Sequence, residues 1–177
     1  MKTLIVGTNR PLSKTRAVAR VVESIYKELG EPLAVNDLAE LPPEIFHPTS
    51  YAKKPATFEP FLRRVLDSKG LIVVTPEYNG GPPGVLKYFI DMLPFPESFE
   101  RRPVCFVGLG AGIWGGLRPV EHLQQIFGYR NAYLYPERVF IKGVHEMLDK
   151  DGNFVNPEIR ERLQNQARGF IQFVARF

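Results

Sequence analysis

The sequence predicts one α/β domain, in which a parallel β-sheet is covered by helices on both faces. Short apolar runs alternate with amphipathic segments along the chain. The apolar runs contain few polar residues, which is typical of parallel strands buried on both faces. The 177 residues, 44% of them hydrophobic, suffice for one hydrophobic core. Since strand–helix crossovers are right-handed, strict alternation makes neighbouring strands parallel. We therefore treat residues 1–177 as a single domain.

The first strand–helix unit sets the pattern for the rest. Thr3–Val6 is a short apolar run and is expected to form the first strand. A helix is expected from Lys14, with Ser13 as its N-cap and Gly30 at its end. Its apolar residues recur on one face: Val18, Val21, Val22, Ile25 and Leu29.

The later units follow in the same order. Further strands are expected at Pro32–Leu38, Gly70–Pro76, Pro103–Gly108 and Asn131–Ile141. Helices are expected around Phe58–Leu66, Gly84–Leu93 and Leu117–Phe127, and a last helix opens at Asn156 and continues to Val174. Between the second strand and the second helix, Ala39–Thr57 contains four prolines, which predicts a long irregular loop.

Composition excludes several classes of protein. Lys and Arg number 23 against 19 Asp and Glu, a net charge of +4 that favours small anionic ligands only mildly. The basic pairs are dispersed, so we expect no nucleic-acid surface: Lys53–Lys54, Arg63–Arg64 and Arg101–Arg102. Cys105, the single cysteine, excludes an internal disulfide and is expected to be a small buried hydrophobe. No apolar stretch approaches the roughly 20 residues of a membrane span. We expect a soluble, cytoplasmic protein with no membrane partner.

Ligands of open parallel sheets bind beyond the carboxyl ends of the strands, so the loops there are informative. The first, Gly7–Arg16, joins a buried strand to a helix start and is rich in hydroxyl and guanidinium groups. Those groups, backbone N–H donors and the positive end of a helix dipole are what a phosphate requires. The candidate phosphate ligands are Thr8, Arg10, Ser13, Thr15 and Arg16. No Walker A motif is present.

Two further loops at this edge are rich in glycine and proline. In Thr75–Gly84, prolines fix the backbone, and glycines let it approach a flat heterocycle, although a rigid turn explains the same residues. In Gly108–Gly116, five glycines imply that the main chain approaches something closely. The G-x-G-x-x-G match in this loop is in the wrong place for a dinucleotide fingerprint. Trp114 is expected to be a packing or interface residue more than a stacking one.

These loops resemble the NAD(P)H-dependent FMN reductase family. The first loop fits G-S-x-R-x-x-S-x-x-R, with Thr8 in place of the first serine. The second fits P-E-Y-N-x-S-x-P-G-x-L-K-x-x-I-D from Pro76 to Asp91, except that Gly81 replaces the serine. The third fits a glycine-rich G-x-x-G-G-x-x-G-G stretch only loosely. The loss of a hydroxyl at Gly81 bears on flavin affinity and substrate preference.

The resemblance implies a flavodoxin-like fold with strand order 2-1-3-4-5 and an FMN site. The FMN phosphate would lie among the first-loop ligands named above. The isoalloxazine ring would lie against the second and third loops: Pro76, Glu77, Tyr78, Asn79, Gly80 and Gly81, with Gly110, Ala111 and Gly112 on another side. NADPH or NADH would supply hydride for a small-molecule acceptor: a quinone, an azo compound, a metal oxyanion such as chromate, or free flavin. The family is commonly dimeric or tetrameric.

Because the flavin carries the chemistry, no catalytic side chain is required. The three histidines, His47, His122 and His145, are isolated and lack the spacing of a metal site. Glu77 is interpreted as a loop-stabilising carboxylate more than a general base. We expect a homodimer or homotetramer, because Pro94–Phe99 and Phe46–Pro60 would expose aromatic residues beside the site. Two alternatives stay open: a flavodoxin-like electron carrier, and a non-catalytic nucleotide-binding or regulatory module.

Overall fold

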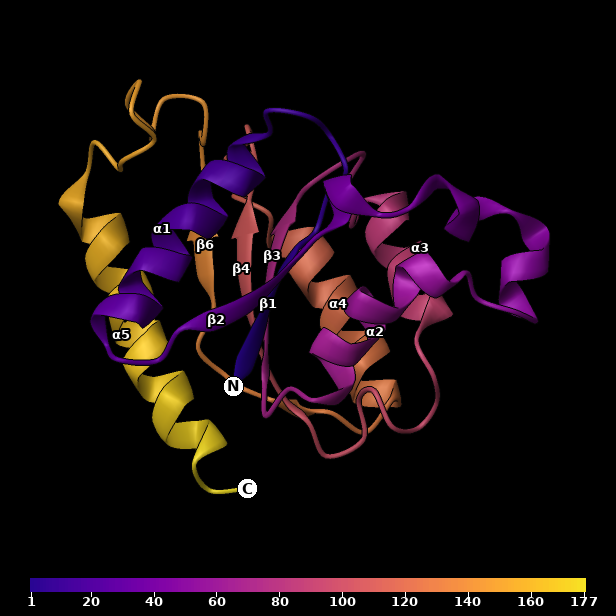
Figure 1. Cartoon of the computed structure of the whole chain (residues 1–177). Helices are drawn as coiled ribbons and strands as arrows, with labels where there is room; N and C mark the ends of the chain where they lie inside the picture. Colours follow the sequence, from indigo (N-terminus) through magenta and orange to yellow (C-terminus); the bar gives the residue numbers. More distant parts are fainter.

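The sheet has the strand order β2-β1-β3-β4-β5, with β6 paired to β4 next to β5 (Figure 1). The structure is a computed structural model that describes residues 1–177. Every strand pair is parallel. The strands are β1 (Lys2–Val6), β2 (Leu33–Asp37), β3 (Leu71–Pro76), β4 (Pro103–Leu109), β5 (Tyr133–Leu134) and β6 (Val139–Ile141). The predicted flavodoxin-like strand order is confirmed.

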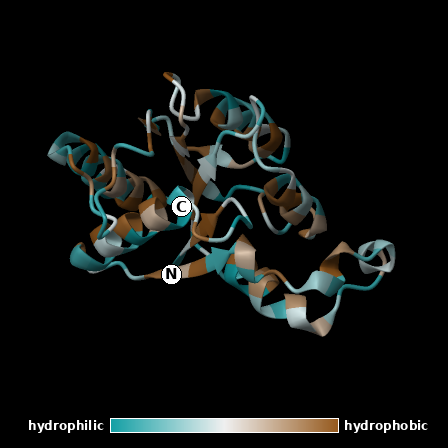
Figure 2. Cartoon of the chain, turned by 90° about the horizontal axis from the view of Figure 1, so that it is seen from above, coloured by the Kyte–Doolittle hydropathy of each residue, from teal (hydrophilic) through white to brown (hydrophobic).

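Five α-helices cover the two faces of the sheet. They are α1 (Lys14–Glu28), α2 (Glu59–Leu66), α3 (Gly84–Met92), α4 (Leu117–Tyr129) and α5 (Pro157–Val174). Alternate strand residues divide the core: Leu4 and Val6 of β1 pack with α1 and α5, whereas Ile5 packs with α2, α3 and α4. Figure 2 shows hydrophobic residues between these layers and hydrophilic ones along the outer helix faces. None of the helices combines the length and the apolar character needed to cross a bilayer.

The predicted fifth strand at Asn131–Ile141 is broken in two. Val104 of β4 pairs with Leu134, and Val107 pairs with Val139, so two extra residues are inserted opposite β4. Pro136 lies in this insertion and has no N–H to donate to the ladder. The buried amide of Gln166 on α5 fills the gap, donating to the carbonyls of Phe106 (2.9 Å) and Glu137 (3.0 Å).

The segment between β2 and α2 is more ordered than the predicted irregular loop. Strand β2 ends at Asp37, and four short 3-10 helices follow: η1 (Leu38–Glu40), η2 (Pro43–Phe46), η3 (Pro48–Tyr51) and η4 (Ala56–Phe58). Prolines open η2 and η3, where their missing N–H costs no helical bond. This segment projects sideways from the body of the domain beside α3 (Figure 1).

Candidate functional site

The start of α1 presents unused hydrogen-bond donors at the carboxyl edge of the sheet. The hydroxyl of Ser13 accepts from the backbone N–H of Arg16 (3.2 Å), as predicted for an N-cap. The four backbone N–H groups of Leu12–Thr15 have no partner in the protein. Leu12 has a left-handed φ of +54°, and such turns form concave anion sites from successive N–H groups. The helix dipole adds positive potential, so these groups together can accept an anion such as a phosphate.

A hydroxyl pair ties the first loop to the second. Thr8 is 1% exposed, and its Oγ1 accepts from the backbone N–H of Arg10 at 3.2 Å. The same oxygen lies 3.0 Å from the phenolic oxygen of Tyr78. Thr8 therefore connects the two loops, and its contact with a phosphate stays a prediction of the family resemblance.

The second loop contains a tight two-residue turn. Tyr78 and Gly81 exchange backbone hydrogen bonds of 3.0 Å in both directions. Asn79 and Gly80 between them have φ values of +51° and +77°, the left-handed pair of a hairpin turn. Their N–H groups have no partner in the protein. A flat ring with acceptor atoms along its edge can meet these donors, because glycine at 80 and 81 leaves the turn uncovered.

Glu77 has the loop-stabilising surroundings that were expected. Its backbone N–H donates to the carbonyl of Leu109 at 2.9 Å. Its carboxylate faces the guanidinium of Arg118 on α4, with Oε1 3.6 Å from Nη1. The side chain thus connects the second loop to α4.

The glycines of the third loop mostly serve contacts within the protein. A Cβ on Gly116, whose φ is +84°, would collide with the backbone of Gly108 and Leu109. A Cβ on Gly115 would lie 2.7 Å from the backbone nitrogen of Lys142. The close approach predicted for this loop is therefore largely an approach to its own backbone and to the end of β6. Gly112 is different, because no atom lies within 4 Å of its Cβ position.

These loops enclose a cavity of about 510 Å³ at the carboxyl edge of the sheet. Eight predicted site residues line it: Arg10, Ser13, Thr15, Pro76, Glu77, Tyr78, Gly110 and Ala111. Six do not line it: Thr8, Arg16, Asn79, Gly80, Gly81 and Gly112. Six lining residues were missed: Pro11, Leu12, Lys14, Leu109, Val144 and His145. Val144 and His145 follow β6, so they too lie beyond the carboxyl end of a strand, where ligands are expected. The sequence analysis missed them because it did not recognise the break in the fifth strand.

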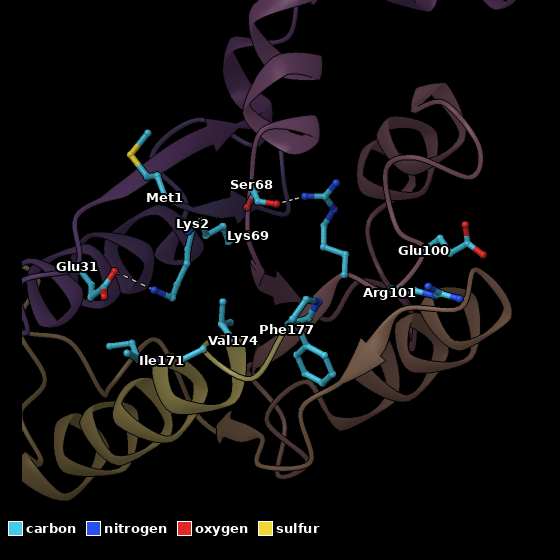
Figure 3. A pocket seen from close by; sticks show the side chains of 13 residues that line it. Met1, Lys2, Glu31, Ser68, Lys69, Glu100, Arg101, Ile171, Val174 and Phe177 are labelled. Atoms are coloured by element: carbon cyan, nitrogen blue, oxygen red, sulfur yellow. Dashed lines mark hydrogen bonds and ion pairs between the residues drawn. The ribbon is translucent and has the colours of Figure 1, made fainter.

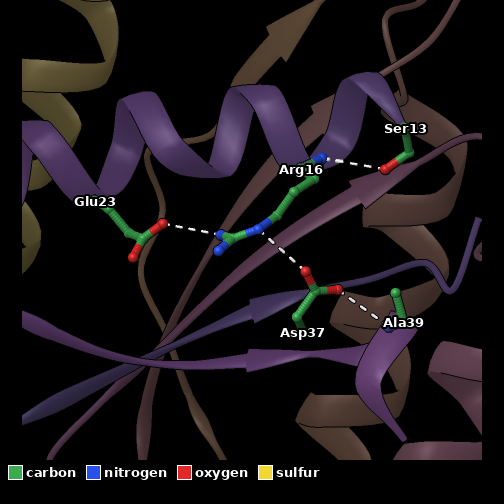
Figure 4. Close-up of polar contacts among 5 residues, drawn as sticks. All are labelled: Ser13, Arg16, Glu23, Asp37 and Ala39. Carbon is green, nitrogen blue, oxygen red and sulfur yellow. Dashed lines mark hydrogen bonds and ion pairs between the residues drawn. The ribbon is translucent and has the colours of Figure 1, made fainter. Parts of the chain in front are cut away.

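Arg16 points away from the cavity. Its Nη1 donates to Oε2 of Glu23 at 2.9 Å, and its Nε lies 3.1 Å from Oδ2 of Asp37 (Figure 4). The guanidinium therefore has two carboxylate partners within the protein. Direct contact of Arg16 with a phosphate stays a prediction of the family resemblance.

A second cavity, of about 580 Å³, lies at the opposite edge of the sheet (Figure 3). Its most buried cations are already engaged. Lys2 pairs with Glu31 at 2.8 Å, and Arg102 donates to the backbone carbonyls of Leu66, Ser68, Glu97 and Ser98. This cavity holds the chain together at the amino ends of the strands, and it lacks the free N–H groups of the first.

Cys105 lies fully buried in β4, in agreement with its interpretation as a small hydrophobe. Burial raises the pKa of its thiol far above the usual range. A thiol held neutral in this way is a poor nucleophile.

The strand order defines a flavodoxin-like fold, and the glycine turns and the helix start place unpartnered N–H donors at its carboxyl edge. The comparison of sequences gives the family directly: the chain belongs to the NADPH-dependent FMN reductase family, whose model matches residues 2–146. All three loops of the site fall within that match.

Curated relatives agree with this assignment, and a solved structure agrees with the fold. A quinone reductase of Escherichia coli is 28% identical over 97% of this chain and 94% of its own length. An NAD(P)H-dependent FMN reductase of Pseudomonas aeruginosa is 28% identical over 83% of this chain and 80% of its own. The flavoenzyme NAD(P)H:(acceptor) oxidoreductase of Paracoccus denitrificans superposes with a TM-score of 0.81 at 21% identity, covering 99% and 98% of the two chains.

Proposed function

We propose that this protein is an NAD(P)H-dependent FMN oxidoreductase whose flavin site is the cavity at the carboxyl edge of the sheet. The single observation that carries the site assignment is the row of four unpartnered backbone N–H groups at Leu12–Thr15. They suit a phosphate dianion, and the cations of Arg10 and Lys14 on the same cavity wall add charge complementarity. Bound FMN would supply the redox chemistry, the transfer of hydride from a nicotinamide to an acceptor.

The chain's own residues bind and orient the flavin. The donors of Leu12–Thr15 would hold the phosphate end of the molecule, and the unpartnered N–H groups of Asn79 and Gly80, on the turn that follows the cavity residue Tyr78, would be available to the edge of the ring. Donors directed at a ring edge stabilise negative charge that develops there during reduction. The nicotinamide and the acceptor would use the same place beside the ring in turn. The acceptors that we propose are quinones, azo compounds, metal oxyanions and free flavin.

The test is a titration of flavin-free protein with FMN and with riboflavin, followed by flavin fluorescence. The proposal predicts quenching by both and markedly tighter binding of FMN, because only FMN carries the phosphate. The yellow holoprotein is then mixed with NADPH or NADH without oxygen. Bleaching of the visible absorbance without any partner protein indicates the reductase. Failure to bleach indicates the flavodoxin-like carrier, and failure to bind flavin indicates a non-catalytic module.

We also propose a homodimer or homotetramer in the cytoplasm. Phe46 and Tyr51 on the projecting segment are 45% and 58% exposed and pack against Tyr88 of α3, with ring centroids 5.1 and 5.9 Å away. Clustered exposed aromatic residues are typical of interfaces. The expectation that Pro94–Phe99 and Phe46–Pro60 expose aromatic residues beside the site was wrong in two respects. Phe58 and Phe99 are buried. Phe95 is exposed, but it follows α3 at the amino edge of the sheet, away from the site. Light scattering after size-exclusion chromatography measures the state, and a monomer contradicts this proposal.

A further inference from the structure

An arginine in a phosphate motif can contact the phosphate itself or hold the residues that do. The surroundings of Arg16 distinguish these two roles. In Figure 4 its side chain runs from the first turn of α1 towards β2, between Glu23 and Asp37. The side chain is 30% exposed, that of Asp37 is 12% exposed, and that of Glu23 is 32% exposed. By contrast, Arg10 and Lys14 line the cavity, and neither has a carboxylate partner. The cations free to meet a phosphate are therefore the latter two.

Arg16 also connects three parts of the fold. Its backbone N–H is capped by Ser13, at the base of the row of free donors. Asp37 is the last residue of β2, and its second carboxylate oxygen accepts from the N–H of Ala39 at 3.0 Å, which opens η1. The guanidinium thus fixes the start of α1 against the carboxyl end of β2. It also balances the negative charges of Glu23, on the same helix, and Asp37, on the neighbouring strand.

We propose that Arg16 is a positioning residue for the FMN phosphate and not one of its ligands. This inference rests on the proposed function, since it assumes that FMN is the ligand. Arg16 neutralises Asp37 and Glu23 and holds the row of donors in place. Without it, the carboxylates of Glu23 and Asp37 would repel each other and move the start of α1 relative to β2. The displaced donors would then bind the phosphate less well, whereas riboflavin, which has no phosphate, would be affected far less. The expected signature is a loss of preference for FMN over riboflavin that depends on those carboxylates.

The test compares the effect of R16Q in two backgrounds, the native chain and the E23Q/D37N variant. Each protein is titrated with FMN and with riboflavin, and the ratio of the two dissociation constants is the readout. In the native background, R16Q is expected to lower the preference for FMN about tenfold, because two facing carboxylates lose the cation between them and the donor row loses its support. In the E23Q/D37N background the neutral side chains do not repel each other, so the donor row stays in place and only the screened attraction of a distant charge is lost; the change is expected to stay below about threefold.

Two results overturn the proposal. Equal losses of FMN preference in both backgrounds indicate direct contact between Arg16 and the phosphate. No loss in either background indicates a purely structural residue. Asparagine at position 37 keeps an oxygen for the N–H of Ala39, so the E23Q/D37N pair retains this cap. If the single variant R16Q does not fold, the comparison of R16Q/E23Q/D37N with E23Q/D37N still tests the proposal. A tenfold difference in FMN preference between these two variants contradicts a positioning role.

The matched control is R160Q. Arg160 pairs with Glu28 at 2.7 Å, at the far end of the same helix α1. R160Q removes an arginine of α5 and its ion pair with the end of α1, away from Leu12–Thr15. The FMN preference of this variant is therefore expected to equal that of the native chain. If the native chain binds neither flavin, the proposed function fails. If it binds FMN preferentially and only the pattern across variants differs, this inference alone fails.

Discussion

Replacing Gly116 by alanine is predicted to destabilise the protein through the third loop. Gly116 precedes α4 with a φ of +84°, and its Cβ position lies 2.8 Å from the carbonyl carbon of Gly108. A non-glycine residue in this left-handed region costs about 1–2 kcal/mol. Forcing the backbone of Leu109 aside adds about 1–3 kcal/mol, the usual cost of overpacking. The free energy of unfolding should therefore fall by about 3 kcal/mol, a large part of the stability of a domain this size.

Gly112→Ala is the matched control in the same loop. No atom lies within 4 Å of that Cβ position, and the backbone is outside the positive-φ region. Its change in unfolding free energy should stay within about 0.5 kcal/mol. Urea denaturation followed by circular dichroism measures both variants, and the melting temperature of Gly116→Ala should fall by roughly 6–12 °C.

The reasoning is refuted if Gly116→Ala costs less than about 1 kcal/mol, because strain and overlap would then be absent. It is also refuted if Gly112→Ala costs as much as Gly116→Ala. The glycines would in that case act through chain flexibility, and not through the close crossing of β4 and the third loop.

Three further predictions test other contacts. Tyr78→Phe removes the hydroxyl that contacts Thr8, so fluorescence titration should show FMN affinity weakened by about 1 kcal/mol, or roughly fivefold. An unchanged affinity would mean that the two loops keep their separation without this contact. Gln166→Leu leaves the carbonyl of Phe106 without its buried partner, so thermal unfolding should show a loss of about 2 kcal/mol; no loss would contradict the role of Gln166 in bridging the broken strand. Because burial raises the pKa of Cys105, this thiol ionises only in the unfolded chain as the pH rises past about 8.5, so the free energy of unfolding should fall there. Denaturant titrations at pH 7 and pH 10 measure this fall, and Cys105→Ala should reduce it.

Periodicity predicted the strands and helices well where one signal dominated. The buried apolar runs of β1, β3 and β4 have no competing interpretation, and Ser13 caps α1 as its residue type predicts. The broken fifth strand was missed because β-branched and aromatic residues continue on both sides of Pro136. The compensating amide of Gln166 comes from a helix thirty residues further along the chain, and no local pattern indicates such a contact.

The sequence predicted where the candidate site lies, but it predicted the roles of the individual residues only in part. Topology requires that the loops after β1, β3 and β4 meet at one edge, and eight of the predicted residues line the cavity there. A motif records which residue types a loop needs, and it treats a ligand and the residue that holds the ligand in place alike. Thr8 and Arg16 both occur in the phosphate motif, yet one bonds a neighbouring loop and the other bonds two carboxylates. Distinguishing these roles requires side-chain directions, which depend on tertiary packing.

The replacement of the family serine by Gly81 shows how the structure narrows a question that the sequence leaves broad. Gly81 lies outside the positive-φ region, and the nearest atom to its Cβ position is Nδ1 of His122, at 3.5 Å, an ordinary contact distance. The mutual hydrogen bonds between Tyr78 and Gly81 close the turn without any side chain at position 81. A serine there would fit without strain and would leave the turn unchanged. The absence of that serine therefore leaves the turn and the unpartnered N–H groups of Asn79 and Gly80 unchanged, so we expect its consequences in substrate preference more than in the architecture of the proposed flavin site.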